Sequence, residues 1–172
     1  MRLVGQREGR GAARHPRALP AFLGPHRLDR NRTLWGGFVI EAPDGACIYF
    51  AGDSDWCPHF AEIGRRFPRI DLALLPIGAY APRWFMRTQH MDPEEAVRAH
   101  LACGARASLA MQFGTFFRLT DEPIDEPASL LRDAMARHGV APGAFRVPGF
   151  GETLLFDAPR NIQKSCRAAS VT

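Results

Sequence analysis

Short apolar runs, separated by turn residues and by segments of helical periodicity, extend along the middle of this chain. The run Ile70–Ile77 is almost continuously apolar, which is typical of a strand covered on both faces. A Pro-Asp-Gly turn within Ala42–Gly45 separates two other apolar runs and predicts a hairpin. The pattern predicts strands at Leu34–Glu41, Ala46–Ala51, Ile70–Ile77, Ala107–Gln112 and Gly151–Asp157.

Helices are predicted between these strands. Pro58 suits the first position of a helix. Asp92 is predicted as the N-cap of a second helix, and Glu95, three residues later, completes a capping box. A third helix is predicted over Pro127–His138 and ends at Gly139. The alternation of strands and helices predicts an α/β fold in which a sheet carries helices on its outer side.

Charge is distributed unevenly along the chain. Residues 1–32 contain eight arginines against Glu8 and Asp29, although the net charge of the whole chain is only +4. The first 28 residues are rich in Gly, Arg, Ala and Pro and have no apolar periodicity, so we expect them to be disordered or loosely attached. We therefore expect one folded unit over residues 29–158, followed by a tail without pattern at 159–172.

Composition excludes several classes of protein. No apolar run approaches the roughly 20 residues that span a bilayer, and the first 17 residues lack the apolar core of a secretory signal peptide. The cysteines have no paired spacing, which argues against a disulfide scaffold or a cysteine-rich zinc site and favours a reducing compartment. We therefore expect a cytoplasmic protein, either free or peripheral at a membrane surface.

Three polar residues lie where predicted strands end or a helix begins. Asp53 follows a strand, and a carboxylate there can bridge two cations, although Gly-Asp-Ser is also a common turn. His90 lies in the loop before a helix, where an imidazole can act as ligand or as acid and base, or can be merely solvated. Gln112 ends a strand, where an amide can also cap neighbouring backbone groups. No two histidines have the HxxxH spacing of a helical zinc pair.

Several motifs occur together and in order. They are Leu34-Trp35-Gly36, Phe50-Ala51-Gly52-Asp53, Pro76-Ile77-Gly78-Ala79-Tyr80, Pro82-Arg83-Trp84-Phe85-Met86, His90-Met91-Asp92-Pro93-Glu94-Glu95-Ala96 and Gly114-Thr115-Phe116. Together they closely resemble the C-terminal half of the N-acyl-phosphatidylethanolamine-hydrolysing phospholipase D family, which belongs to the metallo-β-lactamase superfamily. The resemblance covers Asp29–Asp157.

The resemblance implies a metallo-β-lactamase-like αββα sandwich, of which this chain carries only the C-terminal half. It also implies two zinc ions and phospholipase D-like hydrolysis of N-acyl phospholipids, in which a metal-bound hydroxide attacks the phosphodiester. By position, Asp53 corresponds to a catalytic aspartate that bridges the metals, and His90 to a catalytic histidine near the reacting phosphate. The segment beside the substrate groove corresponds to Tyr80, Arg83, Trp84, Phe85 and Met86.

The chain departs from the family pattern at the metal ligands. The motif His-x-His-x-Asp-His is absent from it, Pro20-Ala21 is followed by Phe22 where the family has a ligand segment, and Gln112 occupies the position of the last histidine. An amide oxygen is a poor zinc ligand beside imidazole. We therefore expect impaired activity in this chain alone. The expected substrate is a phospholipid or another phosphodiester, and the expected partner is a second copy or the missing N-terminal half.

Two alternatives to an active hydrolase remain. One is a catalytically inactive remnant, or a binding domain that depends on a partner chain. The other is a module in which the arginine-rich arm binds lipid or nucleic acid. The arm has no interleaved aromatic residues, so we do not expect nucleic acid to be the partner.

Overall fold

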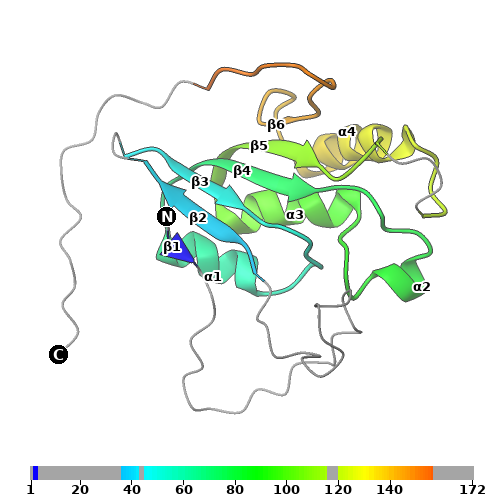
Figure 1. The fold of residues 1–172 in the computed structure, drawn as a ribbon, viewed down its shortest axis with the longest axis horizontal. Coiled ribbons are helices and arrows are strands. Elements are labelled where there is room, and N and C mark those ends of the chain that lie inside the picture. The colour runs from blue at the N-terminus through cyan, green and yellow to red at the C-terminus, as the bar shows by residue number, and fades with distance from the viewer. Residues whose placement is uncertain (1, 4–35, 43–44, 116–119, 157–172) are drawn as a thin grey trace, which may run out of the picture.

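The computed structural model of the protein describes residues 2–3, 36–42, 45–115 and 120–156 (Figure 1). These residues form a six-stranded sheet in which the strand order follows the chain order. The first three strands pair antiparallel, and the third to the sixth pair parallel. The strands are β1 (Arg2–Leu3), β2 (Phe38–Glu41), β3 (Cys47–Phe50), β4 (Ile70–Pro76), β5 (Ala105–Met111) and β6 (Phe145–Arg146).

Helices connect the parallel strands. Helix α1 (His59–Arg66) follows β3, α3 (Pro93–Cys103) precedes β5, and α4 (Glu126–His138) precedes β6. These three helices pack side by side along one face of the sheet, with α3 between the other two (Figure 1). The single turn α2 (Arg83–Met86) projects beyond the edge of the sheet between β4 and α3 (Figure 1).

The two faces of the sheet differ in burial. Side chains on the face covered by the helices are buried and form one hydrophobic core. Along each strand they alternate with side chains that point to the opposite face. The opposite face is also apolar but remains half-buried or exposed. The described residues therefore form one β-layer and one α-layer of the αββα sandwich that the family resemblance implies. The covered face includes Val39, Tyr49, Ala73, Leu75, Ala110 and Phe145, and the open face Phe38, Ile40, Ile48, Phe50, Leu72, Leu74, Leu109 and Met111.

The predicted capping box of the second helix is confirmed. Asp92 Oδ1 accepts a hydrogen bond from the Glu95 amide at 2.8 Å, and Glu95 Oε2 accepts one from the Asp92 amide at 3.2 Å. The helix ends at Gly104, whose φ of 66° lies in the left-handed region that glycine adopts without steric cost. The predicted hairpin is also confirmed, because β2 and β3 pair antiparallel.

The predicted last strand over Gly151–Asp157 is wrong for the residues that the structure describes. Residues 151–156 form no strand, and Leu155 is 89% exposed. The edge of β5 is instead paired with β6, whose Phe145 is buried against the core. The apolar run alone could not reveal that an earlier segment already occupies this edge.

The prediction of a loosely attached N-terminal segment concerns residues that the structure mostly leaves undescribed. Arg2–Leu3 pair with Val39 and Phe38 of β2. Residues 4–28 and the tail at 159–172 lie outside the described part of the chain, so the predictions for them stay predictions.

A buried carboxylate joins two strands at the edge of the sheet where β3 and β4 begin. Asp71, 6% exposed, accepts a hydrogen bond from the Cys47 amide at 2.9 Å and another from Arg69 Nε at 3.3 Å. Burying a carboxylate is costly unless such donors satisfy it. Asp71 therefore fixes the start of β4 against the start of β3, at the end of the sheet opposite the loops described below.

We expect Asp71→Ala to lower the free energy of unfolding by about 1–3 kcal/mol, because the buried Cys47 amide then lacks an acceptor. Asp71→Asn is the matched control, since its amide oxygen can still accept from Cys47. Urea unfolding followed by circular dichroism measures both. Equal stability of Asp71→Ala and the wild-type chain would contradict this role.

Candidate functional site

Three loops meet at the edge of the sheet where the parallel strands β3, β4 and β5 end (Figure 1). The carboxyl ends of neighbouring parallel strands lie at the same edge, and ligands of open α/β sheets bind in the crevice outside these ends. The first loop carries Asp53, the second continues from Ile77 to Tyr80, and the third begins with Gln112. The topology therefore brings together residues that are up to 59 positions apart.

The residues that directly follow β4 and β5 are in contact through their backbone atoms. A Cβ added to Gly78 would lie 2.1 Å from the carbonyl oxygen of Gln112, so only glycine fits at this position. Gln112 itself adopts a φ of 58°, in the left-handed region that side chains seldom occupy. This turn directs the Gln112 amide across the edge, where Nε2 donates a hydrogen bond to Oδ1 of Asp53.

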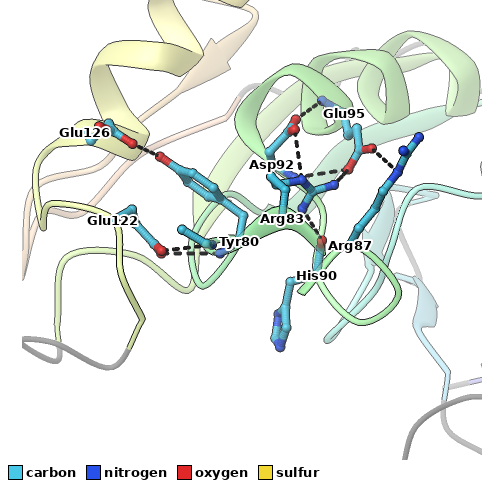
Figure 2. A network of polar contacts seen from close by, with 9 residues as sticks. Tyr80, Arg83, Arg87, His90, Asp92, Glu95, Glu122 and Glu126 are labelled. Carbon is cyan, nitrogen blue, oxygen red and sulfur yellow. Dashed lines mark hydrogen bonds and ion pairs between the residues drawn. The ribbon is translucent and has the colours of Figure 1, made fainter. Parts of the chain in front are cut away.

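His90 lies beside this pair and is held by its backbone. Its amide donates to the Met86 carbonyl at 2.9 Å, and its carbonyl accepts from Arg83 Nη1 at 2.9 Å. The ring points away from the polar network that fixes the backbone (Figure 2). The buried Nδ1 has no hydrogen-bond partner among the described residues. The backbone of His90 is thus fixed, and the residue lines the cavity described next.

A cavity of about 680 Å³ opens between these loops, with Asp53, His90 and Gln112 in its lining. Drug-sized and cofactor-sized ligands occupy cavities of roughly 300–1,000 Å³. The lining combines polar residues, which are these three and the segment 120–122, with apolar residues. The apolar residues include Met86, Phe113, Pro123, Ile124 and Pro127. The cavity therefore suits an amphiphilic ligand.

Arg83 anchors α2 to the start of α3. Its Nη2 lies 2.7 Å from Oε2 of the buried Glu95, and its Nε lies 3.4 Å from Oδ2 of Asp92 (Figure 2). Because Nη1 donates to the His90 carbonyl, one guanidinium fixes both the helix cap and the backbone of His90. In this structure Arg83 acts within the chain, and its donors face the chain's own acceptors.

The other residues of the predicted substrate-binding segment separate into three groups. Met86 lines the cavity. Tyr80 is buried and donates a hydrogen bond from its hydroxyl to Glu126 Oε1 at 2.6 Å, and burial, together with this carboxylate, raises the pKa of Tyr80 above its usual range. Trp84 and Phe85 project into solvent, with exposed fractions of 85% and 46%. The structure thus brings one of these five side chains to the cavity itself.

The sequence did not indicate a role for Glu122. This residue lines the cavity, and its carboxylate accepts hydrogen bonds from the loop after β4. Its partners lie 41 to 43 positions earlier in the chain. No periodicity or local spacing marks such a contact. The pair Asp121-Glu122 in a loop before a proline reads only as a solvated turn.

The donor set does not fit a two-zinc site. Across the described ranges, no group of three or more histidines, cysteines, aspartates or glutamates is arranged to hold a metal ion. The Asp53 carboxylate accepts a hydrogen bond from the Gln112 side-chain amide, and the family pattern has a metal-ligating histidine at position 112. A catalytic zinc needs about three protein ligands, so the described residues hold no complete site. His15, His26 and the segment Pro20–Phe22 lie outside the described residues.

Cys57 and His59 form a second pair of potential ligands. The Sγ atom of Cys57 contacts Nδ1 of His59. Burial raises the pKa of Cys57 and lowers the pKa of His59, so both side chains are held in their neutral forms. Without a third ligand among the described residues, this contact is a packing and hydrogen-bonding feature of the β3–α1 connection.

Comparisons with known proteins agree on one superfamily. A family model described as "Beta-lactamase superfamily domain" matches residues 11–112. An N-acyl-phosphatidylethanolamine-hydrolyzing phospholipase D of Caenorhabditis elegans is 38% identical over 126 residues, which are 72% of this chain and 35% of that protein. A metal-dependent hydrolase of Caldivirga maquilingensis is 36% identical over 102 residues, which are 59% of this chain and 40% of that protein. The chain thus spans well under half of each relative.

A solved structure supports the fold. An isothiocyanate hydrolase from Delia radicum gut bacteria superposes with a TM-score of 0.56 at 24% identity. The match covers 71% of this chain and 44% of that protein. At this identity the likeness concerns the arrangement of strands and helices.

We expect the chain to bind Zn²⁺ weakly and below one ion per molecule, because Asp53 has an amide where a second ligand would stand. Gln112→His should raise the affinity by about tenfold or more, since changes even to the partners of metal ligands alter affinity by roughly 10–100-fold. Gln112→Leu, which removes the amide without adding a ligand, is the control. Competition with a chelating dye measures all three. Two tightly held zinc ions per wild-type chain would contradict the interpretation.

Proposed function

The chain belongs to the metallo-β-lactamase superfamily, and on that premise we propose that it forms the substrate-binding part of a hydrolase site for phospholipids. One observation carries the proposal: a cavity lined by polar and apolar residues has Asp53 and His90 in its lining, and the superfamily relationship leads us to expect chemistry at these residues. Zinc is the metal that we propose for the complete site, because imidazole and carboxylate are among its ordinary ligands. The described residues do not hold it alone.

The lining of the cavity supports a phospholipid over a small polar substrate. Met86, Phe113 and Ile124 offer an apolar wall that an acyl chain can cover. The N-acyl-phosphatidylethanolamine-hydrolyzing relative is consistent with such a substrate. A polar head group would then lie near His90 and Gln112, whose side chains can exchange hydrogen bonds with phosphoryl and amide oxygens.

His90 is the residue that we propose to act on the phosphodiester. Its backbone is fixed by Met86 and Arg83, and the residue lines the cavity. A fixed imidazole can donate a hydrogen bond to a phosphoryl oxygen or transfer a proton to a leaving group. Asp53 carries a negative charge beside the same cavity, so it does not bind an anionic phosphate directly.

We further propose that α2 contacts a lipid surface. Trp84 and Phe85 expose adjacent rings with centroids 5.7 Å apart, and Met86 of the same turn lines the cavity. Exposed tryptophan is typical of protein surfaces at the membrane interface, and the exposed Arg87 next to them can approach anionic head groups. No helix in the described ranges has the length and apolar character needed to cross a membrane.

A second candidate function is a domain that binds substrate or a partner without catalysing a reaction. The open apolar face of the sheet and the incomplete ligand set favour it. A second sheet, or a second copy of the chain, would cover that face. Release of phosphatidic acid from N-acyl-phosphatidylethanolamine vesicles, with and without added zinc, separates the two candidates. Turnover by this chain would rule out the second.

We expect the chain to bind dihexanoylphosphatidylethanolamine, a soluble short-chain phospholipid, in the cavity. Ile124→Glu should weaken binding by about tenfold or more, because it places a charge against the acyl chains in the apolar wall. Leu101→Glu makes the same change at an exposed leucine on α3 that does not line the cavity. Isothermal titration calorimetry measures both. Equal affinities would mean that the lipid binds elsewhere.

We expect Trp84→Ala to reduce binding to vesicles that contain anionic phospholipid, with the cavity affinity for dihexanoylphosphatidylethanolamine unchanged. The reason is that Trp84 is 85% exposed and does not line the cavity. Vesicle co-sedimentation measures the first quantity and calorimetry the second. Leu155→Ala, at an exposed apolar residue outside the cavity lining, is the control. Unchanged vesicle binding by Trp84→Ala would contradict the docking of α2.

A further inference from the structure

We propose that Glu122 is a positioning residue, whose carboxylate holds the loop after β4 in the shape that makes it one wall of the cavity. The proposal rests on the proposed function of that cavity. It concerns a contact between two segments that are distant in the chain: the loop at 79–81 and the segment at 120–122. Both segments contribute residues to the cavity lining.

The contact consists of three hydrogen bonds from consecutive backbone amides. Glu122 Oε1 accepts from Ala79 at 2.6 Å and from Tyr80 at 3.3 Å, while Oε2 accepts from Ala81 at 3.0 Å. Consecutive amides that point to one side form a concavity that binds anions in many proteins. Here the anion is the chain's own carboxylate, as Figure 2 shows beside Tyr80.

The loop needs such a contact because its backbone is strained. Ala79 has a φ of 61°, in the left-handed region that disfavours residues with a Cβ. A non-glycine residue keeps this conformation only when its surroundings impose it. The neighbouring Gly78 packs against the Gln112 carbonyl. The Glu122 carboxylate and this backbone contact therefore both restrain the turn.

Two further links hold the same loop, one to the segment at 120–122 and one to the first residue of α4. The Asp121 amide donates to the Ala81 carbonyl at 3.4 Å, and the Tyr80 hydroxyl donates to Glu126 at 2.6 Å. The loop then leads directly into α2, whose Met86 lines the cavity and whose Arg83 holds the His90 carbonyl. Displacement of the loop would thus move both the wall of the cavity and the residues that follow it.

The electrostatics of Glu122 agree with a charged clamp. Burial by itself would raise the pKa of this carboxyl. Hydrogen bonds from Thr120, from its own backbone and from the amides of Ala81 and Ala79 outweigh that effect and lower the pKa below its usual range. The carboxylate is therefore ionised at neutral pH, which strengthens each of its hydrogen bonds.

Glu122→Gln tests the clamp with minimal change of shape. One amide oxygen can replace only one of the two carboxylate oxygens, so at least one of the three backbone amides faces an NH₂ group. Glu126→Gln is the matched control, because the Tyr80 hydroxyl can still donate to its amide oxygen. If Glu122→Gln does not fold, Glu122→Asp is the second variant. It keeps the negative charge on a side chain that is shorter by one methylene, and it should change amide exchange and lipid affinity in the same direction to a smaller degree.

Amide hydrogen exchange and lipid affinity give two independent readouts. We expect exchange at Ala79, Tyr80 and Ala81 to accelerate by about tenfold or more in Glu122→Gln, and the affinity for dihexanoylphosphatidylethanolamine to fall by about tenfold. We expect neither change in Glu126→Gln. Accelerated exchange with unchanged affinity would overturn the positioning role, and unchanged exchange would overturn the clamp. If the wild-type chain did not bind this lipid, the proposed function would fail, and the exchange rates would still decide for or against the clamp.

Discussion

The candidate site depends on one close backbone contact between the residues that follow β4 and β5. Gly78 packs on the carbonyl of Gln112 so tightly that no side chain fits between them. This contact sets the separation of the loops after β4 and β5. At the same contact Gln112 adopts a left-handed conformation, and its amide donates to Asp53. The cavity forms around the point where these loops meet, so its shape follows from backbone packing before any side chain contributes chemistry.

The carboxylates around the cavity serve mainly as internal ligands. Glu95 closes the cap of α3 and pairs with Arg83, Glu122 accepts three backbone amides, and Glu126 accepts the Tyr80 hydroxyl. These contacts make a rigid frame from segments that are otherwise loops. His90, the Asp53–Gln112 pair and Asp121 are among the other polar residues that line the cavity. A rigid frame around a lining of polar and apolar residues fits the binding of an amphiphile better than it fits a complete metal centre.

Local patterns in the sequence predicted most of the fold. The capping box of Asp92 and Glu95 and the hairpin between β2 and β3 are signalled by neighbouring residues, and both are confirmed. The pairing of β6 with β5 and the clamp of Glu122 involve residues far apart in the chain, so the sequence showed neither. For the site, Asp53, His90 and Gln112 were found as polar residues at element ends. Sequence spacing could not show that the Arg83 guanidinium points into the chain toward Glu95.

The central claim is that the part of the cavity at His90 receives the head group of a phospholipid. A nuclear magnetic resonance titration of the chain with dihexanoylphosphatidylethanolamine tests it most directly, with the His90 ring signals assigned by comparison with His90→Gln. The account predicts saturable shifts of the His90 ring protons, together with the methyl signals of Met86 and Ile124, which also line the cavity. Shifts confined to Ile48, Leu72 and Leu74 on the open sheet face, with His90 unchanged, would contradict it.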